Sequence, residues 1–71
     1  MIDLEKFAQR VKELRKLSGL TQQQVSQATS IKQTTISCWE MGKYPPTTEL
    51  LVLYAEYFDV SVDYLLGRAD I

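Results

Sequence analysis

The 71-residue sequence contains no histidine and only one cysteine, Cys38, and each shortage excludes a class of function. Most acid–base and nucleophilic catalysis depends on histidine or on a cysteine beside a base. A cluster of metal ligands and a glycine-rich phosphate loop are also missing from the sequence. We therefore predict that the chain is not an enzyme and uses no cofactor and no metal. A lone cysteine also excludes an internal disulfide framework, as is typical of a reducing cytoplasm.

Long hydrophobic runs are absent too. No stretch approaches the roughly 20 apolar residues that a membrane helix needs. The N-terminus alternates charged with apolar residues, which is unlike a signal peptide. Apolar residues make up 45% and charged residues 24% of the chain, which are ordinary globular values. The sequence predicts one small cytoplasmic domain over residues 1–71, with no membrane partner.

The net charge of −1 is low for a protein that binds phosphate, but the charges are unevenly distributed. From Lys6 to Lys43 the chain has seven basic residues against two acidic ones. From Tyr44 onward it has one basic residue against five acidic ones. One half of the molecule could therefore face phosphate while the other repels it. Two solvated surfaces of different sign account for the same counts, so the charge alone does not decide the function.

The first part of the chain follows the pattern of an amphipathic helix. Its apolar residues recur three or four positions apart, at Leu4, Phe7, Ala8, Val11 and Leu14. Asp3 can cap the start of this helix, and Gly19 can end it as a left-handed residue.

Two shorter helices follow. Thr21 and Gln24 fit a capping box, which predicts a second helix with Val25 and Ala28 facing inward. The third helix is expected at about residues 33–41.

The last part of the chain predicts two more helices. Pro45 and Pro46 interrupt helical structure. Thr47 or Thr48 then caps a fourth helix that continues through Phe58, and Ser61 caps a last one at residues 62–66. Five helices with connections of two to six residues predict a compact all-α domain.

The third helix has an outer face without charge. Its inward residues are Ile36, Trp39 and Glu40, and its outward ones are Thr34, Ser37, Cys38 and Met41, with Gln33 at the leading edge. Solvated helices usually carry Lys and Glu at such positions. Short hydrogen-bonding side chains suit the edges of DNA bases instead. An ordinary polar surface is the alternative at this point.

An ordered combination of residues resembles the helix-turn-helix of the phage repressor and Cro-type (XRE-like) family. It comprises Leu20-Thr21-Gln22, Val25, Ala28, Ile31, Thr35-Ile36-Ser37, Trp39-Glu40 and Gly42-Lys43, followed by Pro46, Leu51, Ala55, Phe58 and Val60 to Gly67. The resemblance covers about residues 7–67. It implies a lambda-repressor-like fold, with the helix-turn-helix at about 21–41 and C-terminal helices at about 47–67. It also implies a bacterial or phage-encoded protein that associates with the nucleoid when bound.

The resemblance also assigns roles to individual residues. It implies contacts with DNA bases from Gln33, Thr34 and Cys38, with Ser37 beside them. It implies contacts with DNA phosphates from Gln22, Lys32 and Lys43. It further implies a buried ion pair between Arg15 and Glu40, which would also neutralise a carboxylate near a helix C-terminus.

The sequence departs from the family at the turn. Ser30 stands where glycine is usual, and a left-handed conformation there would cost about 1 kcal/mol. Thr29 replaces an apolar residue, and Lys32 replaces a serine cap. Cys38 is shorter than the usual polar side chain, and no nearby cation supports a redox role for it.

The C-terminal half has more apolar surface than a domain of this size can bury. Leu50, Leu53 and Tyr57 form a second stripe on the fourth helix, and Val60, Val62 and Tyr64 extend it. The resemblance places dimerisation in this region. We expect a homodimer interface at Leu53, Tyr57, Val60 and Tyr64. Tyrosines that are half-buried with solvated hydroxyls are the alternative.

Together these patterns predict sequence-specific binding of double-stranded DNA by a dimeric transcriptional repressor on a pseudo-palindromic operator. No small-molecule ligand is evident. A protein-interaction module in which the helix-turn-helix is only a scaffold is the rival hypothesis. An antitoxin that binds both its toxin and its own operator would combine the two. Salt-dependent DNA binding separates these alternatives.

Overall fold

The computed structural model describes residues 3–71, and within that range helices are its only regular secondary structure. The helices are α1 (Leu4–Leu17), α2 (Gln22–Thr29), α3 (Gln33–Glu40), α4 (Thr48–Phe58) and α5 (Val62–Leu65). The all-α prediction is confirmed. Helix α3 ends one residue earlier than expected because Met41 is its C-cap, and α5 ends one residue earlier because Leu66 is its C-cap. No helix within residues 3–71 is both long and apolar enough to span a bilayer.

Short polar side chains start four of the five helices. The Asp3 carboxylate accepts the Lys6 backbone N–H of α1 at 3.1 Å. In α2 the capping box is complete, since Thr21 accepts from the Gln24 backbone and the Gln24 side chain accepts from the Thr21 backbone. Thr47 and Ser61 cap α4 and α5 by accepting one backbone N–H each, without a capping box. These bonds satisfy N–H groups that a helix leaves free at its start.

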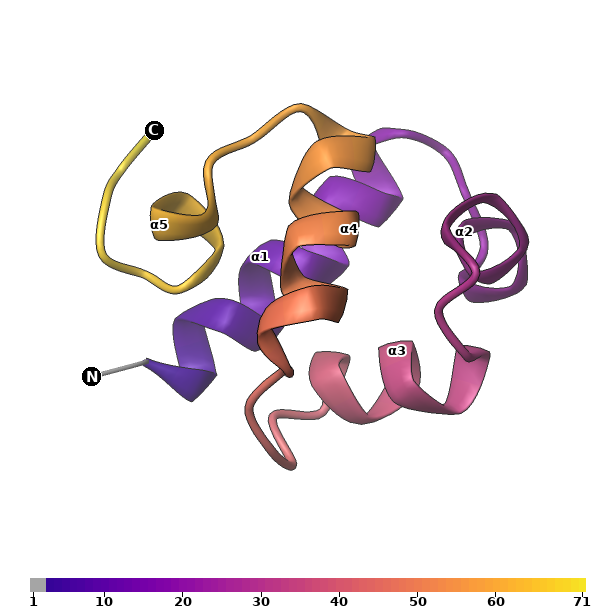
Figure 1. Ribbon diagram of the computed structural model, residues 1–71, viewed down its shortest axis with the longest axis horizontal. Coiled ribbons are helices and arrows are strands. Elements are labelled where there is room, and N and C mark those ends of the chain that lie inside the picture. The colour runs from indigo at the N-terminus through magenta and orange to yellow at the C-terminus, as the bar shows by residue number, and fades with distance from the viewer. Residues whose placement is uncertain (1–2) are drawn as a thin grey trace.

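The helices divide into two sides around a central pair (Figure 1). Helices α1 and α4 overlap in the centre of the view, α2 lies to their right, α3 lies below and to the right, and α5 with the C-terminal segment lies to their left. Helix α3 packs against α1 and α2, and α5 packs against α1 and α4. Both sides therefore pack against the same two central helices.

An aromatic column fills that middle. The Trp39 ring of α3 lies 5.5 Å from the Phe7 ring of α1 and 5.9 Å from the Tyr54 ring of α4, both edge to face. The Tyr54 ring then lies 4.7 Å from that of Phe58. Such contacts add to the free energy gained by burying the rings. The column thereby joins α1, α3 and α4.

Tyr54 is fully buried, although the helical pattern did not assign it to the core. Its hydroxyl donates a hydrogen bond to the carbonyl of Val11 in α1 at 2.6 Å. Burial raises the pKa of Tyr54, so the phenol stays protonated and remains a donor. A polar atom in the core is thus satisfied and links α4 to α1.

The expectation that Ala28 faces the core is wrong. Ala28 is exposed, and Thr29 is buried in its place. The Thr29 hydroxyl donates to the carbonyl of Val25 at 2.7 Å and accepts the backbone N–H of Ile31 at 3.3 Å. The buried hydroxyl both donates and accepts, and it satisfies an N–H in the turn that an apolar residue would leave unpaired.

The C-terminal segment is held against α1 by Arg10. Its guanidinium donates to the carbonyls of Tyr64 and Ala69 and lies 4.2 Å from the centre of the Tyr64 ring. Asp70 adds an ion pair at 3.8 Å. One basic residue therefore serves the structure of the domain and is not free to meet a ligand.

Candidate nucleic-acid interface

Helices α2 and α3 are joined by the tight connection of residues 30–32. Ser30 adopts a left-handed conformation with φ of 66°. The turn therefore keeps the geometry that glycine would favour, at a conformational cost of about 1 kcal/mol. Ile31 is buried and fixes the connection to the core. Helix α3 is thereby held beside α2 with its other face outward.

The outer face of α3 carries the side chains that the sequence assigned to DNA bases. Gln33 and Thr34 are exposed, whereas Ser37 and Cys38 are half-buried. The structure brings all four onto one helix, with the most accessible at its N-terminal end. Gln33 and Thr34 are therefore the most accessible of the four, and Gln33 also has the longest side chain.

Two exposed lysines flank this face. Lys32 is the N-cap of α3 and makes no side-chain capping bond. Lys43 follows the C-terminus, and its backbone N–H donates to the carbonyl of Cys38 at 3.1 Å. Both side chains are exposed. The uncharged face of α3 thus lies between two cations, which is the arrangement expected if bases are contacted in the middle and phosphates at the ends.

Tyr44 is a residue at this face that the sequence analysis missed. The residue is 45% exposed, and its phenol lies beside the side chains of Cys38 and Thr35. The neighbouring Cys38 thiol raises the pKa of Tyr44, and burial adds to the shift. Gly42, with φ of 70°, turns the chain at the end of α3 and brings the following residues back alongside it. Gly42 marks the turn in the sequence, but not the side chain that the turn brings to this face.

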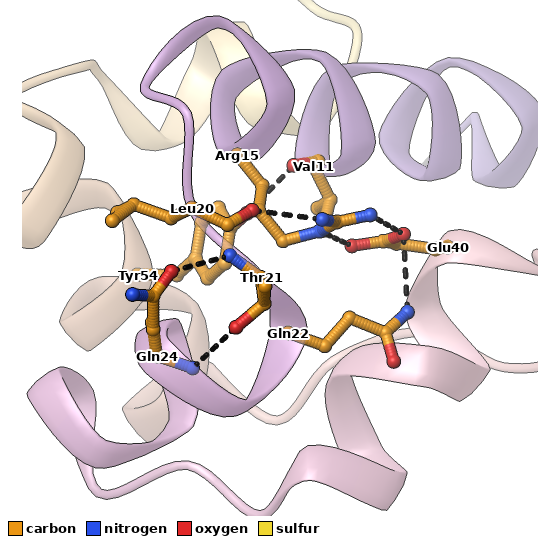
Figure 2. A network of polar contacts seen from close by, with 8 residues as sticks. All are labelled: Val11, Arg15, Leu20, Thr21, Gln22, Gln24, Glu40 and Tyr54. Atoms are coloured by element: carbon orange, nitrogen blue, oxygen red, sulfur yellow. Dashed lines mark hydrogen bonds and ion pairs between the residues drawn. The ribbon is translucent and has the colours of Figure 1, made fainter.

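A polar network behind α3 joins three helices (Figure 2). Arg15 of α1 donates to both carboxylate oxygens of Glu40, through Nε at 2.6 Å and Nη2 at 2.9 Å. Its Nη1 donates to the carbonyl of Leu20 at 2.9 Å, just before α2. The Gln22 carboxamide donates to Glu40 Oε1 at 3.2 Å.

This network is shielded from solvent. The Arg15 side chain is 13% exposed and that of Glu40 only 6%. Hydrogen bonding to Glu40 is the largest contribution to the raised pKa of Arg15, and burial opposes it. The family resemblance implied the pair of Arg15 and Glu40 but did not connect Gln22 to it.

Five lysines of the basic half are exposed, whereas its two arginines are used internally. They are Lys6, Lys12, Lys16, Lys32 and Lys43. Arg10 binds the C-terminal segment and Arg15 binds Glu40. The charge available for phosphate is therefore smaller than the count of seven suggests. Within residues 3–71 there is no detectable pocket and no group of three side chains suited to a metal ion.

The outer face of α4 is the other conspicuous surface. Val52, Leu53 and Tyr57 are 38%, 39% and 44% exposed, respectively. Val60 is half-buried against the core, and the half-buried Tyr64 ring lies under the Arg10 guanidinium. Of the four residues expected at a dimer interface, Leu53 and Tyr57 therefore offer more surface than the other two. Val52 adjoins them and was not among those expected.

Comparison with known proteins places these features in context. A family model described as helix-turn-helix matches residues 11–65. The chain is 36% identical over 64 residues to the uncharacterised HTH-type transcriptional regulator YobD of Bacillus subtilis (strain 168), covering 90% of this chain and 57% of that protein. It is 34% identical over 65 residues to the HTH-type transcriptional activator BcrR of Enterococcus faecalis, covering 92% of this chain and 32% of that protein.

A solved structure agrees with these matches. The restriction-modification controller protein C.AhdI from Aeromonas hydrophila superposes with a TM-score of 0.79 at 27% sequence identity, covering 89% of this chain and 96% of that one. The chain spans 57% of YobD and 32% of BcrR, so it corresponds to only part of each of these two relatives.

Proposed function

The chain belongs to the helix-turn-helix family of the phage repressor and Cro type, and from that membership we propose that it binds specific double-stranded DNA sequences and regulates transcription. The observation that carries the proposal is the uncharged outer face of α3 between two exposed lysines. Base edges offer hydrogen-bonding groups and methyl groups to such a face, while the backbone offers anions to the lysines.

In the proposed complex α3 enters the major groove and the start of α2 lies across the backbone. Gln33 can form a bidentate pair with adenine, and the Thr34 methyl can contact thymine. Lys32 and Lys43 bind phosphates on either side. Gln22, the first residue of α2, contacts a further phosphate where the helix dipole favours an anion.

We propose that the bound form is a homodimer joined through α4. The support is the exposed apolar surface of Val52, Leu53 and Tyr57. Two copies related by a two-fold axis would read a pseudo-palindrome with half-sites about 10 bp apart. We propose repression as the regulatory outcome, because it requires only that the domain occupy a site that overlaps a promoter.

Selection of bound sequences from a random DNA pool tests this proposal. The selected sites should show dyad symmetry, and the protein should bind them as two copies per site. The double substitution Leu53→Glu with Tyr57→Glu should give a folded monomer that binds weakly. Leu17→Glu is the matched control, because Leu17 is an 81% exposed leucine on α1. Selected sites without symmetry, or a saturating complex with one copy, would contradict the dimer.

The apolar face of α4 also supports a second candidate, a module that binds another protein, with an antitoxin as the case that combines both activities. Salt titration separates them, since the logarithm of DNA affinity falls by about 0.9 per phosphate contact for each unit of log salt. A salt-independent or absent DNA affinity would favour the interaction module.

A further inference from the structure

We propose that Glu40 is a positioning residue for the DNA backbone contact, because it holds the Gln22 carboxamide in the orientation that donates to phosphate. The inference rests on the proposed DNA binding. It gives Glu40 a role beyond its ion pair with Arg15, and it connects the interior of the domain to its binding surface through one hydrogen bond, between Gln22 Nε2 and Glu40 Oε1.

The first step is the chemistry of the two groups. An ionised carboxylate only accepts hydrogen bonds, whereas a carboxamide has a donating and an accepting end. The Gln22 amide must therefore direct its NH₂ group toward Glu40, as Figure 2 shows. Without this partner the amide could rotate by half a turn and present its carbonyl oxygen, which a phosphate oxygen would repel. The Nε2 nitrogen carries a second N–H, which remains available to a phosphate.

The second step is the rigidity of the carboxylate. Both oxygens of Glu40 are fixed by Arg15 in a bidentate pair, and Arg15 is anchored in turn to the Leu20 carbonyl. The anchor point lies two residues before Gln22. The Gln22 side chain is therefore held at both ends. Its backbone is fixed at the start of α2, and its amide is bonded to Glu40 of α3.

The third step is electrostatic. A bare carboxylate behind the contact would repel the DNA backbone, since both are anions. The bidentate Arg15 neutralises Glu40, so Gln22 bridges from a pair of zero net charge. The half-buried Gln22 is itself neutral, and its contact with phosphate displaces no counterion. Its loss should lower affinity without changing the salt dependence, unlike the loss of a lysine.

A double-mutant cycle on DNA affinity tests the inference, at a temperature where circular dichroism shows every variant to be folded. Gln22→Ala should weaken binding to all sequences by roughly tenfold, the value of one charge-assisted hydrogen bond, with an unchanged salt slope. Glu40→Gln should weaken binding by several-fold in the wild-type background and have no further effect in the Gln22→Ala background. If Glu40→Gln does not fold, Arg15→Met with Glu40→Met takes its place in the cycle, since it leaves no lone charge.

Gln23→Ala is the matched control, because Gln23 is the next residue of α2, is exposed, and makes no side-chain hydrogen bond to Glu40 among residues 3–71. The effect of Glu40→Gln should persist in that background. Equal effects of Glu40→Gln with and without Gln22 would overturn the inference and leave Glu40 with a purely structural role. A wild-type protein that shows no salt-dependent DNA binding would refute the proposed function itself, which is a distinct result.

Discussion

The two sides of the domain are built from different kinds of side chain and present different surfaces. On the α2 and α3 side, polar groups reach the interior and are paired there, as in the contacts of Glu40 with Arg15 and Gln22. On the other side, where α5 lies against the central helix α4, aromatic rings pack in the interior and apolar residues remain on the surface. The first side presents short uncharged polar groups, and the second presents hydrophobic surface with acidic neighbours.

The comparison teaches that the binding surface depends on what is paired behind it. Polar groups behind α3 can fix the direction of a surface side chain, because hydrogen bonds are directional. Behind α4 the groups are apolar apart from the Tyr54 hydroxyl, which bonds to the α1 backbone and not to a surface side chain. They fix the position of the helix, which suffices for a surface that would bury area against a second copy. Substitutions behind α3 should therefore change DNA recognition and stability together, whereas substitutions behind α4 should change stability alone.

The largest effect is expected at the ion pair. Arg15→Met leaves the 6% exposed Glu40 carboxylate without its cation and should lower the free energy of unfolding by about 3 kcal/mol, the low end for a buried pair. Adding Glu40→Met should recover part of that loss. Urea unfolding of the wild type, both single variants and the double variant measures the coupling. Strictly additive losses would contradict the coupling seen in the network.

Base contacts are expected to give the next largest effect. Gln33→Ala and Thr34→Ala should each reduce discrimination between specific and random DNA by about 1–3 kcal/mol. Lys43→Ala should weaken all sequences alike and reduce the salt slope by about one unit. Fluorescence anisotropy at several salt concentrations measures both quantities. Equal losses on specific and random DNA for all three variants would refute this division of roles.

A smaller loss is expected from the other side of the molecule. Tyr54→Phe removes the hydroxyl that donates to the Val11 carbonyl and should cost about 1 kcal/mol of unfolding free energy. DNA affinity at full folding should not change, since the aromatic column remains. A loss of affinity comparable to that of Gln22→Ala would break the proposed contrast between the two sides.

The smallest effect should come from the two left-handed non-glycine residues, one on each side. Ser30→Gly should stabilise the domain by about 0.5–1 kcal/mol, because φ of 66° strains a residue that carries Cβ. Asp59→Gly, at φ of 54°, should gain less, since aspartate tolerates this conformation better than serine. Thermal melts of both variants give the comparison. A larger gain at Asp59 would contradict the order.

Local features were predictable from the sequence, and contacts between distant segments mostly were not. Asp3, Thr21 and Ser61 were identified as caps because a cap and its N–H partner lie three residues apart. The assignment of Ala28 to the core failed because positions three and four after Val25 both satisfy a helical period. In a helix as short as α2, residue type decided between them and favoured alanine over threonine.

The role of each cation was the part least accessible from the sequence. Arg10 counts toward the basic half of the sequence, yet its side chain donates to backbone carbonyls 54 and 59 residues away. Arg15 was placed correctly only because the family resemblance supplied its partner. The contact between Tyr44 and Cys38 depends on how the chain leaves α3 at Gly42, which spacing does not reveal.

The aromatic column also provides a spectroscopic reporter. Trp39 is the only tryptophan of the chain, it is 1% exposed, and it contacts Phe7 and Tyr54 from the two central helices. Its indole Nε1 has no hydrogen-bond partner among residues 3–71. The folded protein should therefore emit at short wavelength. The emission should shift to the red when α1 or α4 separates from α3. Because the indole faces inward, DNA binding should leave this emission almost unchanged, so one fluorophore follows unfolding without interference from the ligand.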